Sequence, residues 1–348
     1  MCTVANGLAA RNVDVTLTLV DAKGPFLADV HPDVRVIDFG AASVWRALPA
    51  LTRHLRASRP AALLSAMNHA NVVAALAHRL ARSRARLVLS ERAHLSSVLA
   101  EFPGPRMQAT FALMRLTYRW ADNVVTVSTQ VAQDLQRHVP LAPERVVTIY
   151  NPVVDTQLER LARAPAQHPW LAGGGKPVVL GVGRLIAQKD FATLLEAFAL
   201  LRRDRLARLV ILGEGELREG LLAQARRLGV ADDVSLPGFE PNPFAAMRAA
   251  RVFVLSSRFE GLPGVLVQAM ACGTPVVSTD CPAGPREILE DGRWGQLVAV
   301  GDVGALAAAI AAVLDAPQAP DVRARAAEFS EERAVGHYAE VLGVSGAA

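Results

Sequence analysis

The chain has 348 residues, of which 51% are hydrophobic and 20% are charged, and its formal net charge is +4. This length suggests two domains, and the hydrophobic content is enough to bury substantial cores. The mean hydropathy of +0.25 is high, yet no run of about 18 uncharged apolar residues marks a transmembrane helix.

The cysteines and the start of the chain predict a reducing compartment. Cys2, Cys272 and Cys281 are an odd number, and they show no spacing typical of a metal site. No secretory signal peptide opens the chain. We therefore expect a cytoplasmic protein.

Charge is distributed unevenly between the two halves. Residues 1–150 hold 17 Lys and Arg against 10 Asp and Glu, a balance of +7, which leaves 20 basic and 23 acidic residues, a balance of −3, in the remainder. The first half is thus the one expected to meet an anionic partner or surface.

An arginine cluster is densest within that basic half, at Arg79, Arg82, Arg84 and Arg86. A solvated helix end explains this cluster about as well as contact with the inner face of a membrane or with a lipid diphosphate. Nucleic acid is disfavoured, because no aromatic strand platform or known reader motif accompanies the charge.

Strands alternate with helices along the first half, which predicts parallel sheets covered by helices. The expected helices include 4–11, 71–81 and 106–121, and the last of these carries apolar residues on two faces, as a buried helix does. The expected strands are 13–20, 62–65, 87–89, 124–127 and 146–150.

The second half continues the alternation with six expected strands. The Pro/Gly-punctuated stretch 155–176 breaks the pattern and predicts a domain linker. An Ala-rich helix is expected over 304–314, and a terminal helix over 328–342.

Residues 256–279, SSRFEGLPGVLVQAMACGTPVVST, are the most informative segment. A strand over 252–255 leads into Glu260-Gly-Leu-Pro, a helix follows to about Cys272, and Gly273 with Pro275 ends it. A carboxylate and free backbone N–H groups thus lie together beyond the carboxyl end of a strand, where open α/β sheets bind ligands. An ordinary βαβ unit with a surface Glu is the alternative.

A second candidate site lies upstream, where an apolar strand over 177–183 ends in glycine. Gly183 lets the backbone approach a ligand, and Arg184 and Lys189 beside it supply the positive charge that a diphosphate needs. A solvated helix entry explains the two cations about equally. The dinucleotide fingerprint fits poorly, because Ile186 occupies its third glycine position, and residues 173–176 do not form a Walker loop.

Taken together, these segments resemble family four of the retaining glycosyltransferases. The resemblance covers more than a hundred residues in order and spacing, and is looser in the first half, where Tyr150-Asn-Pro152 matches a crossover. Its segments are 181–185, 212–215, 236–239, 260–263, 269–277, 279–282, 284–288 and 300–302.

The resemblance implies the GT-B fold, in which two Rossmann-like α/β domains with parallel sheets face a cleft. It implies an acceptor-binding domain over 1–154 and a nucleotide-sugar domain over 177–327. It places the linker between them, and it implies that residues 328–348 include a helix that crosses back to the first domain.

The implied activity is transfer of a sugar from a nucleotide diphosphate sugar, with a UDP-sugar as donor, to a saccharide or lipid-linked acceptor during polysaccharide or glycan biosynthesis. Retention at the anomeric carbon and independence from metals and cofactors are also implied, and the sequence contains no Asp-x-Asp. Glu260 resembles the family Glu that holds donor-sugar hydroxyls, and Arg184 and Lys189 would stabilise the leaving diphosphate. The resemblance extends the donor site to Gly183, Gly238, Phe239, Gly261, Leu262, Pro263 and Gln268.

On the acceptor side, three candidates follow a strand end: Glu91, Arg92 and His94. His94 is as well explained by a structural role in the loop as by proton transfer.

Two features depart from the family pattern. The strand and glycine turn that normally precede the first helix are not found, which predicts a first domain without its first strand. Gln268 replaces a second Glu, so that contact with the ribose would lose charge assistance. A non-catalytic nucleotide-sugar binder is therefore an alternative to a transferase, and an epimerase on the same fold is a weaker one.

Overall fold

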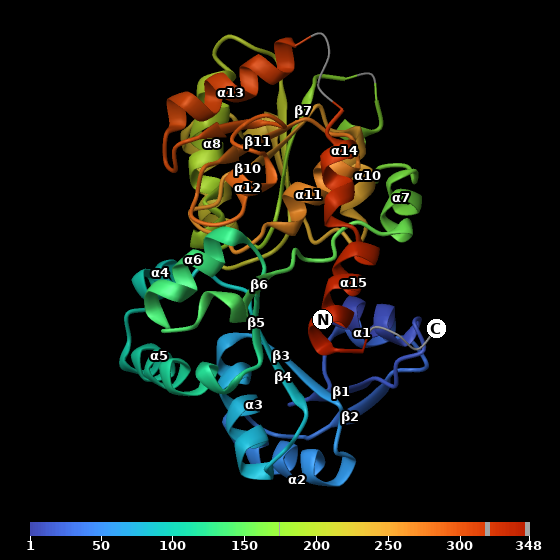
Figure 1. Ribbon diagram of the computed structural model, residues 1–348. Coiled ribbons are helices and arrows are strands. Elements are labelled where there is room, and N and C mark those ends of the chain that lie inside the picture. The colour runs from blue at the N-terminus through green and yellow to red at the C-terminus, as the bar shows by residue number, and fades with distance from the viewer. Residues whose placement is uncertain (174, 317–320, 345–348) are drawn as a thin grey trace. The chain divides into compact units, whose positions relative to one another are not determined.

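The chain folds into two compact units, seen in the computed structural model in Figure 1. The structure describes residues 1–173, 175–316 and 321–344. Unit 1 consists of Met1–Pro152 together with the segment from Glu331 onward, and unit 2 is Val153–Ser330. Each unit is an α/β layer structure with parallel strands, as the sequence predicts.

Unit 1 contains two separate parallel sheets in its described residues. Strands β3 (Ala62–Ala66), β4 (Arg86–Glu91), β5 (Asn123–Thr126) and β6 (Val146–Thr148) pair in chain order. Strand β1 (Thr16–Leu19) pairs with β2 (Arg35–Asp38) instead. The sequence analysis missed β2, which is short and whose side chains are mostly exposed.

The helices of unit 1 include a pair formed from opposite ends of the chain. Helix α1 (Cys2–Ala9) packs against α15 (Glu331–Leu342), and a Cβ added at Gly7 would lie 2.4 Å from Val335. The remaining α-helices of the described unit are α2 (Leu48–Ser58), α3 (Asn68–Ala81), α4 (Leu95–Glu101), α5 (Pro105–Thr117) and α6 (Thr129–His138).

One apolar layer covers both sheets of unit 1. It joins Val13 and Val15 beside β1 to Ala62 and Leu64 of β3, under Val4, Leu8, Val335 and Tyr338 of the α1–α15 pair. The two sheets therefore share a core although they share no strand pairing.

Helix α5 and the 3-10 turn Tyr118–Trp120 after it differ from the single buried helix over 106–121 that the sequence predicts. Met114 and Tyr118 are buried on one face, but Leu116 on the other face is 44% exposed. Apolar residues lie on two faces of the helix, and the neighbouring α3 and the sheet bury only one of these faces.

Unit 2 contains a six-stranded parallel sheet, the number of strands expected. Its order is β12 (Gln296–Val298), β11 (Val276–Thr279), β10 (Val252–Leu255), β7 (Val178–Val182), β8 (Arg208–Leu212) and β9 (Val234–Gly238). The order of the strands reverses between β7 and β10, which pair through Val252 with Val179. Ligands of such sheets bind outside the carboxyl ends of the strands at this switch point.

Helices cover both faces of the unit 2 sheet (Figure 1). Helices α8 (Phe191–Leu201), α9 (Arg218–Arg227) and α13 (Val303–Asp315) bury one core. The others are α7 (Thr156–Ala162), α10 (Pro243–Ala249), α11 (Gly264–Ala271), α12 (Pro285–Ile288) and α14 (Arg323–Ala326).

The stretch 155–176 differs from the linker that the sequence predicts, because the structure places it inside unit 2. It contains α7, which packs on α10, and Asn242 donates to the Leu161 carbonyl at 3.0 Å. Leu158 and Ala162 are buried on this contact. Helix α7 is therefore a packed element of unit 2.

The first and last residues of unit 2, where the chain enters and leaves it, lie side by side. The backbone N–H groups of Val153 and Val154 donate to the Phe329 carbonyl at 3.0 and 3.1 Å. Unit 2 thus begins and ends at one β-bridge, between Val154 and Ser330. Helix α15 starts at Glu331, three residues after the predicted start at 328.

Candidate functional site

The loops that follow β7 and β10 meet at the switch point of unit 2 through an ion pair. Lys189 Nζ donates to Glu260 Oε1 at 2.5 Å. Both side chains are largely buried, with 15% and 9% of their surface exposed. Lys189 and Glu260 are 71 residues apart in sequence, and the sheet topology brings them together.

Two further contacts fix the Glu260 side chain and backbone. Ser257 Oγ donates to Glu260 Oε1 at 2.7 Å, and the Glu260 N–H donates to the Pro282 carbonyl at 3.0 Å. The buried Cys281 thiol lies nearby, and burial together with the Glu260 charge raises the pKa of that thiol to about 12. Cys281 is therefore a neutral packing residue beside the carboxylate.

The turn after β7 presents its two cations differently. Lys189 ends a short 3-10 turn, Ala187–Lys189, and Ser256 Oγ donates to its carbonyl at 2.8 Å. Arg184 is exposed, and it forms no ion pair within the described residues. Because Lys189 is already paired, an incoming anion meets one unpaired cation at this turn.

Close backbone packing holds the ends of β7 and β8 together. Gly213 has a φ of +138°, and a Cβ there would lie 2.0 Å from the Gly183 carbonyl oxygen. Only glycine allows this approach. The predicted turn Gly238–Phe239 follows at the end of β9, where the Phe239 side chain is 77% exposed.

The Gly261–Pro263 segment leads into α11 beside the ion pair. Leu262 and Pro263 are buried, and a Cβ at Gly284 would lie 2.4 Å from Pro263 Cδ. Gln268 is partly buried within α11. Helix α11 begins at Gly264, so Glu260 lies one loop before the helix N-terminus.

The predicted donor residues thus gather at the carboxyl edge of the unit 2 sheet. A buried carboxylate, a cation paired with it, an unpaired arginine and glycine-rich loops lie at the ends of neighbouring strands. This arrangement suits a ligand that combines a diphosphate with a polyhydroxylated group.

In unit 1, the acceptor-side candidate Glu91 is turned inward at the end of β4. It is 1% exposed, and it accepts hydrogen bonds from Tyr118 Oη at 2.9 Å and from the N–H groups of Arg92 and Ala93. Burial raises the pKa of Glu91 to about 7, although these hydrogen bonds oppose the shift. The neighbouring Arg92 donates to Asn151 Oδ1 at 2.7 Å.

His94 is held on both ring nitrogens. Its Nδ1 lies 2.8 Å from Ser97 Oγ and caps α4, while Nε2 lies 3.6 Å from Asp134 Oδ1. Burial lowers the pKa of His94. This geometry supports the structural role of His94.

A polar cluster around the buried Asp134 was not found from the sequence. Asp134 accepts from the Ser96 N–H at 3.0 Å and from Ser96 Oγ, which also lies 2.8 Å from His138 Nε2. The contacts join α4 to α6. His94, Ser96, Asp134 and His138 do not form a recognisable spacing, so no sequence signal pointed to them.

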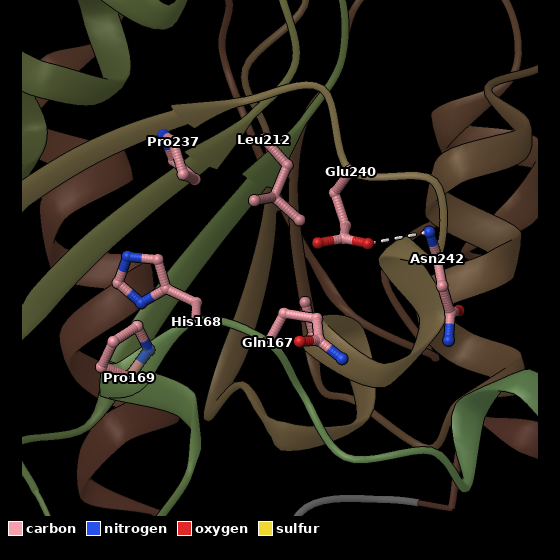
Figure 2. Close-up of a pocket in the computed structure, with 8 residues that line it drawn as sticks. Gln167, His168, Pro169, Leu212, Pro237, Glu240 and Asn242 are labelled. Atoms are coloured by element: carbon pink, nitrogen blue, oxygen red, sulfur yellow. Dashed lines mark hydrogen bonds between the residues drawn. The ribbon is translucent and has the colours of Figure 1, made fainter.

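A separate pocket of about 190 Å³ lies in unit 2, next to the ends of β8 and β9 (Figure 2). The Glu240 carboxylate points toward it and accepts from the Asn242 N–H at 3.0 Å. His168 also lines the pocket, and its Nε2 lies 3.0 Å from Ser235 Oγ. Lys189 and Glu260 do not line this pocket, which the sequence analysis did not predict.

The described ranges 1–173, 175–316 and 321–344 lack two features. They contain no group of three or more His, Cys, Asp or Glu side chains placed to hold a metal ion. None of their helices combines the length and the apolar character that crossing a membrane requires.

Solved structures share the fold of the whole chain. The Anabaena protein HepE in complex with UDP and glucose matches with a TM-score of 0.80 and 23% identity, over 98% of this chain and 95% of that chain. The apo lipopolysaccharide outer core galactosyltransferase WaaB matches with a TM-score of 0.74 and 17% identity, over 98% and 94%. At these identities, the similarity shows the fold, which is GT-B.

Two family models together cover most of the sequence. The model described as Glycosyltransferase Family 4 matches residues 1–157, and the model described as Glycosyl transferases group 1 matches residues 176–316. The fold and the strand-edge site define the GT-B class of glycosyltransferases. Within that class, the chain belongs to family four, with a group 1 C-terminal domain.

A curated relative is the Campylobacter jejuni N-acetylgalactosamine-N,N'-diacetylbacillosaminyl-diphospho-undecaprenol 4-alpha-N-acetylgalactosaminyltransferase. It is 33% identical over 234 residues, 67% of this chain and 61% of its own length. The lipopolysaccharide core biosynthesis glycosyltransferase LpsE of Rhizobium meliloti is 38% identical over 162 residues, 47% of this chain and 46% of its own length. The chain spans less than two thirds of either relative.

Proposed function

We propose that the protein transfers a sugar from a nucleotide diphosphate sugar to a saccharide hydroxyl, with retention at the anomeric carbon. The observation that carries this proposal is the Lys189–Glu260 ion pair at the switch point of unit 2. It brings a cation and a carboxylate together on neighbouring loops, where the cation would bind a diphosphate and the carboxylate would bind sugar hydroxyls. A nucleotide sugar presents both groups within one molecule.

The barrier of this reaction is charge separation. The bond between the anomeric carbon and the diphosphate oxygen breaks, so the sugar becomes cationic and the diphosphate gains negative charge. Arg184 and Lys189 stabilise that charge, and Glu260 holds the sugar hydroxyls. The acceptor oxygen then bonds to the anomeric carbon from the same face, and its proton passes to the departing diphosphate oxygen.

A UDP-sugar is the proposed donor. A solved structure of the same fold contains UDP-glucose, and others contain UDP. The exposed Phe239 after Gly238 offers an aromatic surface for the base. No Asp-x-Asp occurs in the sequence, which supports transfer without a metal ion.

The proposed acceptor is a saccharide or a lipid-linked saccharide of a cell-surface polymer. The Campylobacter jejuni relative is named for an acceptor carried on diphospho-undecaprenol. We further propose that the protein acts in the cytoplasm and contacts the membrane surface through unit 1, without contact to nucleic acid.

A cationic and apolar surface of unit 1 supports this contact. Residues 39–90 contain eight Arg and no Asp or Glu. The Arg79 guanidinium lies 5.4 Å from the Trp120 ring centre, between the ends of α3 and α5. Leu80 follows Arg79 in the chain and is 53% exposed, and Leu116, four residues before Trp120, is 44% exposed. Arginines around exposed Leu and a Trp suit an anionic lipid surface.

The test is donor binding followed by turnover. Thermal shift should show UDP and UDP-sugars raising the melting temperature more than GDP or ADP at matched concentrations. A ligand at 100 times its dissociation constant stabilises the folded protein by roughly 2.7 kcal/mol. Transfer to an acceptor should follow, with a product of retained configuration and no loss of rate in EDTA. Binding without transfer or donor hydrolysis would instead indicate the non-catalytic binder, and epimerised donor without acceptor would indicate the epimerase.

A further inference from the structure

The two oxygens of the Glu260 carboxylate have different surroundings. Lys189 Nζ reaches Oε1 at 2.5 Å, and Ser257 Oγ reaches the same oxygen at 2.7 Å. Within the described parts of the chain, both side-chain donors to this carboxylate thus meet Oε1. Oε1 accepts hydrogen bonds from the protein, and these bonds fix the orientation of the carboxylate.

Ser257 is itself held rigidly. It is fully buried, and Thr279 Oγ1 donates to its carbonyl at 2.6 Å from the end of the neighbouring strand β11. A buried hydroxyl on a fixed backbone has little rotational freedom, so its hydrogen bond restrains Glu260 strongly.

The loop that carries Ser257 is also joined to the turn that carries Lys189. The Arg258 N–H donates to the Gln188 carbonyl at 2.8 Å, and Gln188 Nε2 donates to the Phe259 carbonyl at 2.9 Å. Ser256 Oγ donates to the Lys189 carbonyl at 2.8 Å. The adjacent serines therefore support different members of the ion pair: Ser256 supports Lys189, and Ser257 supports Glu260.

We infer that Ser257 is a positioning residue for the donor sugar: with Lys189 it fixes Oε1 of Glu260 and so aims Oε2 at the sugar hydroxyls. This inference rests on the proposed function of the site. The terminal torsion of a Glu side chain is broad, so the carboxylate needs an external restraint to hold one orientation. Ser257 supplies a restraint that does not itself contact the diphosphate.

Ser257 thus acts on the sugar and not on the nucleotide, and this separates it from the residues that bind the diphosphate. Loss of the Ser257 hydroxyl should leave the affinity for UDP unchanged. Affinity for the preferred UDP-sugar should fall about ten-fold, the size of one lost hydrogen bond to a charged group.

The experiment measures dissociation constants by calorimetry for UDP and for a panel of UDP-glucose, UDP-galactose and their N-acetylamino counterparts. Ser257→Ala is compared with the parent. Ser235→Ala, which removes a side-chain contact to His168 away from the ion pair, is the matched control. Ser257→Cys fills the same space with a weak donor, and melting temperatures verify that each variant folds.

The expected result is a selective loss of UDP-sugar affinity in both Ser257 variants, with a higher KM for the donor in turnover assays. Recovery in Ser257→Cys would assign the effect to packing and overturn the inference, as would equal losses for UDP and UDP-sugar or no loss at all. A parent protein that binds neither ligand would refute the proposed function itself. A parent that prefers UDP-sugar over UDP, with an unaltered Ser257→Ala, would refute only the role of Ser257.

Discussion

Tyr118 donates its hydroxyl hydrogen to Glu91 at a distance of 2.9 Å inside unit 1, where both side chains are buried. Asn71 Nδ2 donates to the same Tyr118 oxygen at 3.0 Å. A carboxyl group in this position links the stability of the fold to pH.

The pKa of Glu91 rises from 4.5 to about 7 on folding, because burial disfavours the ionised form. Between these values the folded protein holds a proton that the unfolded chain has lost, so stability is full below about pH 4.5 and falls as pH rises to about 7. We expect the ionisation of Glu91 to lower the free energy of unfolding by roughly 3 kcal/mol across that pH range. Unfolding by denaturant at pH 5 and pH 8 should show a smaller loss in Glu91→Gln. The exposed Glu144→Gln is the control, and an equal pH dependence in all three proteins would contradict the role of Glu91.

Arg184→Ala should weaken UDP binding by roughly 1.5–3 kcal/mol, because it removes a charge-assisted contact to the diphosphate. Stability should change little, since Arg184 is exposed. Calorimetry with UDP measures the effect, and Arg227→Ala on α9 controls for a general loss of positive charge. Unchanged UDP affinity in Arg184→Ala would remove this residue from the donor site.

Lys189→Ala should lower both affinity and stability. It leaves the buried Glu260 carboxylate without its cation, a change that costs roughly 3–5 kcal/mol for a buried pair. Adding Glu260→Gln should recover part of the stability and none of the UDP affinity. The double-mutant cycle separates the two effects, and equal stability of the single and double variants would show that the ion pair is not coupled.

Gly213→Ala should destabilise unit 2 by several kcal/mol, roughly the cost of strain in a disallowed conformation plus a backbone clash. The added Cβ would lie 2.0 Å from the Gly183 carbonyl oxygen. Gly220 in α9 offers the matched control, because a Cβ there meets nothing within 4 Å. Gly220→Ala should stabilise the helix by up to about 1 kcal/mol, and similar melting temperatures for the two variants would contradict this packing.

Anionic vesicles should bind the protein in low salt and release it as salt increases. The double variant Leu80→Ser with Leu116→Ser should sediment with vesicles less than the parent does, since it removes the exposed apolar side chains of the cationic surface. Leu206→Ser in unit 2, which changes a residue 68% exposed, is the control. Equal sedimentation of all variants would exclude this surface, and competition by RNA would indicate a nucleic-acid partner.

Local patterns predicted the strands that lie inside each sheet. The strand over 252–255 has the predicted bounds, because its four residues are all buried and apolar. The sequence analysis missed β2 because its four residues, Arg-Val-Ile-Asp, contain only two apolar positions, of which Ile37 alone is partly buried. The two apolar faces of α5 indicated a buried helix, yet amphipathicity does not reveal whether a neighbour covers the second face.

Residue types and strand ends predicted which side chains gather at the strand-edge site of unit 2, but not how they contact each other. The Lys189–Glu260 pair depends on the strand order, which a linear pattern does not encode. Ser257 carried no signal of its own, since a serine after a strand is common and its partner lies three residues ahead. The inward orientation of Glu91 could have been inferred from its place in a fully buried parallel strand.

Helix α15 completes the core of unit 1 after all of unit 2 has passed along the chain. During synthesis, Val4 and Leu8 would therefore lack their core partners Tyr338 and Leu342 until the end of the chain is made. Unit 2 is a continuous segment, so all of it would be synthesised before that point. We therefore expect unit 2 to fold before unit 1 is complete, in contrast to the usual N-terminal-first order. The first half of the protein becomes stable last, and a stalled or shortened chain would leave it open.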